Sequence, residues 1–255
     1  MVRCRSCGLV FVHPLPGREA LHRHYNTGQS SRIQYYLDVE VADRRSFAEL
    51  LALAEAILPR KGRLLDLGCN VGTCLVSARE RGWDTQGLEI HEEAAAFCRR
   101  ERALDVRTGV LEHDTYPPGS FDLVMMADVV EHLVDPFETL RRVARVLRPE
   151  GLVLISTPDI ERWAARLLQV KPEEHLYYFS PTTMRTALRQ AGLETVRVQG
   201  YDRYHNLTAM VHSTTCGTLF QRLAPLFRAA RGVLGDVVVK LPLSENLLAV
   251  GRKAA

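Results

Sequence analysis

Several features that would mark other classes of protein are missing from this sequence of 255 residues. The formal net charge is only +3, which is too small to indicate a nucleic-acid-binding surface. No apolar run is long enough to cross a bilayer, and the N-terminus lacks a signal-peptide pattern. The six cysteines are scattered, and we find neither repeats nor low-complexity tracts. We therefore expect a cytoplasmic protein with reduced thiols, no nucleic-acid partner and no stable membrane insertion.

The composition is that of an ordinary globular protein, with 46% hydrophobic and 25% charged residues. The length suits one large α/β domain with small additions. We expect an N-terminal arm at 1–42, a core at 43–200 and a C-terminal segment at 201–255. A substrate-side insertion is expected within the core at about 160–180.

The stretch Leu64–Glu89 carries the clearest structural signal. The apolar run Arg63–Leu67 is long enough for a buried parallel strand. Gly68–Gly72 predicts a tight turn that opens onto a helix starting at Thr73. A second strand follows and ends at a carboxylate, Glu89. The predicted unit is a strand, a turn, a helix and a strand, with an acid at the carboxyl end of the second strand.

Such a unit fits a nucleoside cofactor. Glycines let the backbone approach the ligand, and a carboxylate about 20 residues further on accepts hydrogen bonds from a ribose diol. The layout serves both NAD and S-adenosylmethionine. NAD sites favour G-x-G-x-x-G, whereas three other residues separate Gly68 and Gly72 here. An NAD-dependent oxidoreductase, a structural glycine turn and a non-catalytic cofactor-binding module stay open at this point.

Together with Asp66, the turn resembles motif I of class I S-adenosylmethionine-dependent methyltransferases, D-x-G-x-G-x-G. Asn70 replaces the middle glycine, and asparagine is the non-glycine residue that best tolerates the left-handed region. The resemblance implies that the turn holds the methionine moiety, Glu89 the ribose and Leu111 the adenine, with S-adenosylhomocysteine as product. The cofactor-binding residues that it implies are Asp66, Gly68, Cys69, Asn70, Gly72, Glu89, Ile90, Leu111, Ala127 and Asp128.

The remaining elements complete the same fold. Further strands are expected at Asp105–Thr108, Phe121–Met126, Leu152–Ser156, Thr195–Gln199 and Glu245–Arg252. Helices are expected at Asp43–Leu58, His91–Ala103, Phe137–Leu147 and Thr182–Ala191. The resemblance implies a Rossmann-like α/β fold, with a seven-stranded, mostly parallel sheet, helices on both faces and a reversed last strand.

A second motif follows the fourth predicted strand. Asp128, Glu131 and His132 have i, i+3, i+4 spacing and share one face if the segment is helical. The motif resembles that of ubiquinone-biosynthesis O-methyltransferases, where an acid, a glutamate and a histidine hold magnesium. That family carries glutamate at the first position, and Asp128 has a shorter arm. A magnesium site at these three residues and a structural role at the helix start are the two expectations.

The pattern E-H-x-x-x-F-S-P at 174–181 resembles the substrate-side loop of methyltransferases that act on sugars, quinones and polyketides. His175 is the first candidate for a general base, because an imidazole needs little pKa shift to act near neutral pH. The alternative is a histidine bonded to the backbone of its loop. Further candidates are His205 as a base and Tyr178, Tyr204 and His132 as substrate contacts.

The N-terminal sequence Cys4-x-x-Cys7-Gly8 precedes a β-prone run and predicts half of a zinc ribbon. It resembles the second half of a ribbon, C-x-x-C-G-h-h-h-x-P-x-P (h, hydrophobic), carried by one subset of class I methyltransferases. A first cysteine pair would lie upstream, and inert thiols are the alternative. Weaker signals are Tyr25, Tyr35 and Tyr36, which suit a lid or plain packing. Phe220–Leu234 is a basic amphipathic segment that suits a homodimer contact, a substrate lid, a membrane-surface contact or plain packing.

Taken together, the motifs predict methyl transfer from S-adenosylmethionine to a small molecule. The predicted acceptor is a hydroxyl of a natural product, a sugar or a quinone-like compound. Methylation of nitrogen or carbon is the alternative. A nucleic-acid methyltransferase is disfavoured, because the chain lacks both the charge and an Asn/Asp-Pro-Pro-Tyr type motif.

Overall fold

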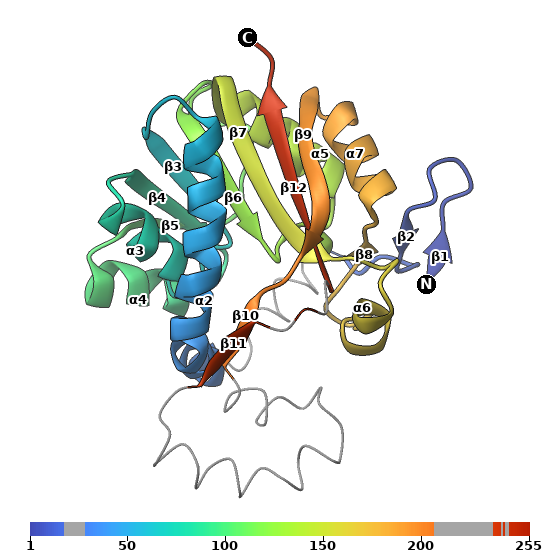
Figure 1. Cartoon of the computed structure of the whole chain (residues 1–255), viewed down its shortest axis with the longest axis horizontal. Coiled ribbons are helices and arrows are strands. Elements are labelled where there is room, and N and C mark those ends of the chain that lie inside the picture. Colours follow the sequence, from blue (N-terminus) through green and yellow to red (C-terminus); the bar gives the residue numbers. More distant parts are fainter. Residues whose placement is uncertain (18–28, 207–236, 241, 243–244) are drawn as a thin grey trace, which may run out of the picture.

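The computed structural model describes residues 1–17, 29–206, 237–240, 242 and 245–255. Its centre is a seven-stranded sheet with the order β5-β4-β3-β6-β7-β12-β9 (Figure 1). The strands are β3 (Arg63–Leu67), β4 (Asp84–Glu89), β5 (Asp105–Thr108), β6 (Phe121–Ala127), β7 (Leu147–Pro158), β9 (Leu193–Tyr201) and β12 (Asn246–Lys253). β12 runs antiparallel to both of its neighbours, and the other pairs are parallel. The predicted Rossmann-like sheet with a reversed last strand is confirmed.

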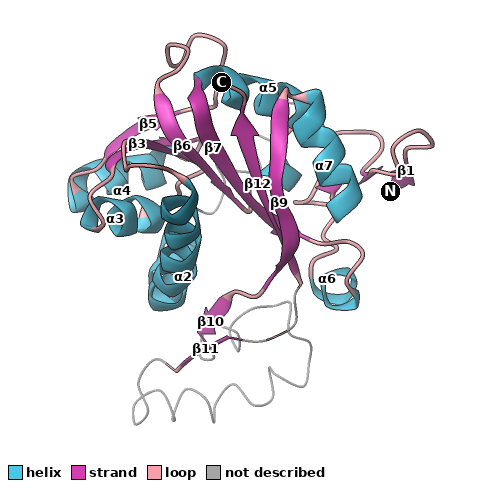
Figure 2. Cartoon of the chain, turned by 45° about the horizontal axis from the view of Figure 1, so that its top comes forward, coloured by secondary structure: helices cyan, strands magenta, loops and turns pink. Residues whose placement is uncertain are grey.

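Helices cover both faces of this sheet (Figure 2). The helices are α2 (Gln29–Ile57), α3 (Thr73–Glu80), α4 (Glu92–Arg102), α5 (Pro136–Val146), α6 (Trp163–Leu168) and α7 (Pro181–Gln190). Residues of α2, α3 and α4 share one hydrophobic cluster, and residues of α5 and α7 share another. Successive strand residues alternate between the clusters, so that Leu64 belongs to the first and Leu65 to the second. Because both faces are buried, the strands read as continuous apolar runs.

Local sequence chemistry fixes most helix ends. The Ser180 side chain accepts the N–H of Thr183, and Pro181 takes the first helical position of α7. Asp135 caps α5 in the same way, and Gly82 follows α3 with a φ of 90°. The predicted bounds of α3, α5 and α7 are therefore confirmed to within one residue.

α2 differs most from its prediction, because it begins at Gln29 rather than at Asp43. Hydrophobic spacing indicates only its second half, where most of its buried apolar residues lie. In the first half, both terminal nitrogens of Arg102 hold the carboxylate of Glu40, at 2.7 and 2.8 Å. Ion pairing to α4 thus joins this half to the domain, which an apolar pattern does not reveal.

The three predicted lid tyrosines have different outcomes. Tyr35 and Tyr36 lie on the first half of α2, with ring centroids 5.4 Å apart. Tyr25 and the predicted segment Phe220–Leu234 lie outside the described residues. None of the described helices is both long enough and apolar enough to cross a membrane.

Two small sheets flank the central one. β1 (Val2–Arg3) and β2 (Val10–Phe11) form a hairpin, and β2 also pairs antiparallel with β8 (Tyr177–Tyr178). β10 (Tyr204–Asn206) pairs with β11 (Val238–Lys240) next to the lower end of α2 in Figure 1. The first of these sheets places the N-terminal hairpin directly beside the predicted substrate loop.

Candidate active site

The turn after β3 has the conformation that its sequence predicts. Gly68, Asn70 and Gly72 have positive φ values of 70°, 48° and 80°. A Cβ on Gly68 would stand 2.7 Å from Val129, and one on Gly72 would stand 2.5 Å from Leu104. Both glycines therefore combine a left-handed backbone with a lack of room for a side chain. Asn70 has the same left-handed conformation at the position where motif I carries its middle glycine.

Glu89 braces this turn from the neighbouring strand. Its side chain is 3% exposed, and its two oxygens accept the backbone N–H groups of Asn70 and His91, both at 2.8 Å. Burial raises the pKa of Glu89, against the effect of these hydrogen bonds. A carboxylate oxygen can accept more than one hydrogen bond. Glu89 can therefore hold the turn and still accept hydroxyl groups of a ribose.

Asp66 lies opposite Gly87 in the parallel pair of β3 and β4, two residues before Glu89. It is buried, and burial together with the negative charge of Glu89 raises the pKa of Asp66 to about 8. A ligand that brings hydroxyls and positive charge to this sheet edge would hydrogen-bond these two carboxyl groups and would favour their ionised forms. An adenosyl cofactor with a ribose, an ammonium and a sulfonium has these groups.

The other predicted cofactor contacts lie along the same edge. Gly109 donates its N–H to the carbonyl of Glu89 at 2.8 Å, which places the following loop beside β4. These further residues are buried or half-buried: Cys69, Ile90, Leu111 and Ala127. Their contacts with a cofactor stay predictions.

Asp128 leaves β6 with a φ of 54° and binds away from the rest of its motif. Its carboxylate pairs with Arg203 and accepts the hydroxyl of Ser156 at 3.3 Å. Arg203 also pairs with Asp43 of α2, at 3.1 Å. The predicted helix face is wrong, because only Val130–His132 is helical, as the short 3₁₀ helix η1. Asp128 itself has the left-handed backbone conformation, and its side chain pairs with Arg203.

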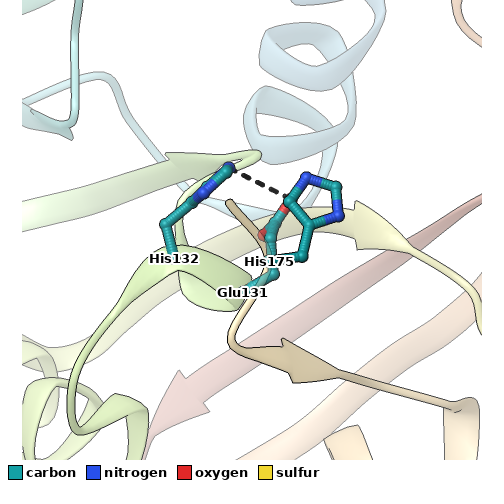
Figure 3. Close-up of side chains that lie close together, drawn as sticks. All are labelled: Glu131, His132 and His175. Atoms are coloured by element: carbon teal, nitrogen blue, oxygen red, sulfur yellow. Dashed lines mark ion pairs between the residues drawn. The ribbon is translucent and has the colours of Figure 1, made fainter. Parts of the chain in front are cut away.

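Three other side chains come together instead, as Figure 3 shows. One ligand atom from each of Glu131, His132 and His175 lies within 4.8 Å of the other two. We call these residues the Glu-His-His cluster. The first two belong to η1, and His175 precedes β8. Leu176 donates its N–H to the carbonyl of Glu131 at 2.8 Å, which holds the two segments together.

Backbone carbonyls fix both imidazoles of the cluster. Nδ1 of His132 is 2.8 Å from the carbonyl oxygen of Glu174, and Nδ1 of His175 is 2.8 Å from that of Gln169. A carbonyl only accepts, so in each neutral ring Nδ1 carries the proton and Nε2 the lone pair. The alternative of a histidine bonded to the backbone of its loop thus holds for Nδ1 of His175. Nε2 of the same ring does not take part in that hydrogen bond.

The carboxylate of the cluster is fixed in a similar way. Oε2 of Glu131 accepts the hydroxyl of Thr157 at 2.9 Å. Oε1 is buried, accepts no hydrogen bond from the described residues, and lies 4.0 Å from Nε2 of His132. Burial raises the pKa of Glu131 to about 7. A buried carboxylate oxygen without a donor is unfavourable unless it is protonated or binds a cation, and Oε2 of Glu245 is a second such oxygen among the described residues.

Burial sets the charge state of His175. Its side chain is 6% exposed, and burial followed by the neighbouring His132 lowers its pKa to about 4. The pKa thus lies below the near-neutral value that suits a single imidazole as general base, and the role of His175 stays a prediction. The imidazole is neutral at physiological pH, keeps its lone pair and binds a proton weakly.

The remaining substrate candidates divide between two places. Tyr178 lies by the cluster, with its ring 6.2 Å from that of His175, and burial raises its pKa to about 12. Tyr204 donates its hydroxyl to Glu49 of α2 at 3.1 Å. Nε2 of His205 lies 3.6 Å from Glu245, and burial lowers the pKa of this histidine. Tyr204 and His205 thus have partners around α2 and β12.

Cys4 and Cys7 lie on the turn between β1 and β2. Gly8 has a φ of 79° and donates its N–H to the carbonyl of Cys4 at 3.0 Å. The hydrogen bond with Ser6 leads the causes that lower the pKa of Cys4 to about 6. A ready thiolate suits a metal, but within the described part of the chain no third ligand joins the pair. Zinc at this turn stays a prediction.

The fold and the site define a class of enzyme. The glycine turn follows β3, the buried acid Glu89 ends β4, and the Glu-His-His cluster lies after β6. Ligands of open α/β sheets bind at these carboxyl ends of the strands. The sequence matches the methyltransferase domain family over residues 37–198. The chain therefore belongs to this family, within the S-adenosylmethionine-dependent methyltransferases, and S-adenosylmethionine is its methyl donor.

Two curated relatives show how far the similarity extends. A putative methyltransferase of Bacillus subtilis, YqeM, is 35% identical over 108 residues, which cover 39% of this chain and 44% of that protein. The chain thus spans less than half of that relative. The ubiquinone biosynthesis O-methyltransferase of Bordetella pertussis is 26% identical over 177 residues, which cover 61% of this chain and 71% of the relative.

Solved structures share the fold. A methyltransferase from Haloferax volcanii, solved with the Trm112 activator, is 19% identical, with a TM-score of 0.62 over 94% of this chain and 100% of the other. An S-adenosylmethionine-dependent methyltransferase from Archaeoglobus fulgidus is 20% identical, with a TM-score of 0.57 over 82% of this chain and 94% of the other. At these identities the likeness shows the fold alone.

Two residues of the site have no signal in the sequence. Arg203 joins α2 to the end of β6 through its two ion pairs. Thr157 positions Glu131 from the end of β7. Both act across chain separations of 26 residues or more, which local spacing does not encode.

Proposed function

We propose that the chain methylates a hydroxyl group of a small molecule, such as a natural product, a sugar or a quinone-like compound. The observation that carries this proposal is the Glu-His-His cluster next to the end of β6. It offers acceptor atoms, two imidazole nitrogens and a carboxylate oxygen, where a hydroxyl must lose its proton. The similarity to ubiquinone biosynthesis O-methyltransferases supports an oxygen acceptor.

The proposed mechanism needs little from the protein beyond position and proton removal. The methyl group of the sulfonium is already electrophilic, so the enzyme holds donor and acceptor in line. The acceptor oxygen attacks the methyl carbon, its proton leaves, and S-adenosylhomocysteine departs as a neutral sulfide. We assign proton removal to the cluster as a unit, with His175 as a member. On its own, an imidazole with a pKa of about 4 is a weak base near neutral pH.

A transfer assay with matched acceptors tests this proposal. The chain is incubated with methyl-labelled S-adenosylmethionine and with phenols, catechols and sugars, each paired with its methyl ether, and with amines of similar shape. We expect S-adenosylhomocysteine and labelled product only with free hydroxyls. Label on nitrogen or carbon would replace oxygen as the acceptor. Cofactor binding without transfer to any acceptor in the panel would support a non-catalytic module instead.

A further inference from the structure

We infer that the Glu-His-His cluster is a binding site for one divalent transition-metal ion. This inference deepens the proposed function and rests on it, since the ion would lie where the acceptor oxygen is expected. Its ligands are Oε1 of Glu131, Nε2 of His132 and Nε2 of His175. Each comes from a buried or half-buried side chain beside the carboxyl edge of the sheet.

The first support is preorganisation. Histidines that bind metals donate Nδ1–H to a carbonyl or carboxylate, which fixes the ring and leaves Nε2 for the ion. Both imidazoles of the cluster already have this arrangement, with carbonyl oxygens at 2.8 Å. The carboxylate is held through its other oxygen by the hydroxyl of Thr157 at 2.9 Å. Each of the three proposed ligand side chains is therefore held in place by a hydrogen bond to an atom that does not itself bind the ion.

The second support is the buried carboxylate oxygen. Oε1 of Glu131 accepts no hydrogen bond from the described residues, although the whole residue is 1% exposed. A buried anionic oxygen without a donor is strongly unfavourable, and a cation removes that penalty. The ligand atoms lie within 4.8 Å of one another and would approach by about 1–2 Å to bind at the usual bond lengths near 2.1 Å. Side-chain torsions allow a movement of this size.

The donor set selects the kind of metal. Two imidazoles and one carboxylate suit zinc, iron, cobalt or nickel, and leave positions open for other ligands. Magnesium prefers oxygen ligands in octahedral geometry. The magnesium set that the sequence predicts would need Asp128, whose carboxylate pairs with Arg203. When bound, a divalent ion would occupy the three acceptor atoms of the cluster and would take over their part in proton removal by lowering the pKa of a hydroxyl that coordinates to it.

Metal titration tests the site without any assay of turnover. The starting protein carries Cys4→Ser and Cys7→Ser, so that the N-terminal thiols do not compete. After treatment with chelator it is titrated with Co²⁺, Zn²⁺ and Mg²⁺ by calorimetry, and Co²⁺ is also followed by visible absorption. We expect one equivalent of Co²⁺ or Zn²⁺ per chain, d–d bands without a thiolate charge-transfer band, and no saturable Mg²⁺ binding.

Variants locate the bound ion. His175→Ala and Glu131→Gln should each weaken Co²⁺ binding by more than about 100-fold, and Thr157→Val by roughly 10–100-fold. His113→Ala, at an exposed histidine outside the cluster, and Asp128→Asn should leave Co²⁺ affinity unchanged. Circular dichroism and thermal unfolding of the same samples report whether each variant is folded.

Three results would overturn the inference: no saturable Co²⁺ binding, unchanged affinity in His175→Ala, or binding that is lost in Asp128→Asn. The inference and the proposed function fail separately. Methyl transfer to hydroxyls together with no saturable Co²⁺ binding would refute the metal site alone. Saturable Co²⁺ binding at the cluster without methyl transfer to any hydroxyl would remove the proposed acceptor alone.

Discussion

Replacing Glu89 by alanine should weaken the binding of S-adenosylhomocysteine without unfolding the protein. In the proposed complex, the carboxylate accepts the two ribose hydroxyls while it holds the N–H groups of Asn70 and His91. A hydrogen bond to a charged group contributes about 1.5–3 kcal/mol. Loss of two such bonds, partly offset by water that enters the space, leaves about 3 kcal/mol, or roughly 100-fold in Kd.

Calorimetric titration of wild type and Glu89→Ala with S-adenosylhomocysteine measures this difference directly. Glu93→Ala is the matched control, because Glu93 is an exposed acid on the first turn of α4. It should bind like wild type. NAD should give no binding heat with any of the three proteins.

Glu89→Gln separates the two tasks of the carboxylate. The amide keeps one oxygen acceptor but presents its NH₂ to a backbone N–H, so we expect an intermediate loss of affinity, about 10-fold. If Glu89→Ala is folded and binds S-adenosylhomocysteine within about threefold of wild type, the ribose assignment is wrong. The turn would then bind the cofactor through its backbone alone.

Four further changes test other parts of the structure. Burying the neutral carboxyl of Asp66 stabilises the fold fully below its unfolded pKa near 3.8, and this contribution is lost as the pH rises to about 8. In wild type, the free energy of unfolding, measured in urea, should therefore fall by up to about 1.4 kcal/mol per pH unit between pH 5 and 8. In Asp66→Asn this fall should be absent. Gly72→Ala should destabilise by at least about 1–2 kcal/mol in the same titration, because φ is 80° and the Cβ meets Leu104; unchanged stability would contradict the turn geometry. Tyr204→Phe should lower stability by about 1 kcal/mol and leave methyl transfer nearly unchanged, whereas a proton-transfer role would cost far more rate. Deletion of residues 1–12 should reduce methyl transfer while affinity for S-adenosylhomocysteine persists; an equal loss of both would show a general effect on folding.

The cofactor half of the site could be predicted from the sequence because it is local. The glycine turn and Glu89 lie within one strand-turn-helix-strand unit, and each residue has a conformational or chemical signature. Positive φ at Asn70 and the two glycines is allowed by residue type, and the motif predicts the turn that uses it. The reversed β12 was predictable only through the resemblance, since the apolar run of β12 does not state its direction.

The acceptor half could not be predicted in the same way, because distant segments assemble it. The spacing groups Asp128 with Glu131 and His132 on one helix face. In the structure, Asp128 has a left-handed backbone conformation and pairs with Arg203, a residue far along the chain. Burial of His175 by the segments around it lowers a pKa that the isolated residue would keep near 6.5. Tertiary context explains both the misplaced helix face and the low pKa of His175, because it overrides local periodicity and the pKa that a side chain has in water.

The N-terminal hairpin shows how this distant assembly is held in place. β2 pairs with β8, and Val12 donates its N–H to the carbonyl of Leu176 at 2.8 Å. The N–H of Leu176 in turn donates to the carbonyl of Glu131. One residue thus connects the cysteine turn, the histidine loop and η1 through backbone hydrogen bonds. These backbone hydrogen bonds therefore fix the hairpin, the loop that carries His175 and η1 relative to one another.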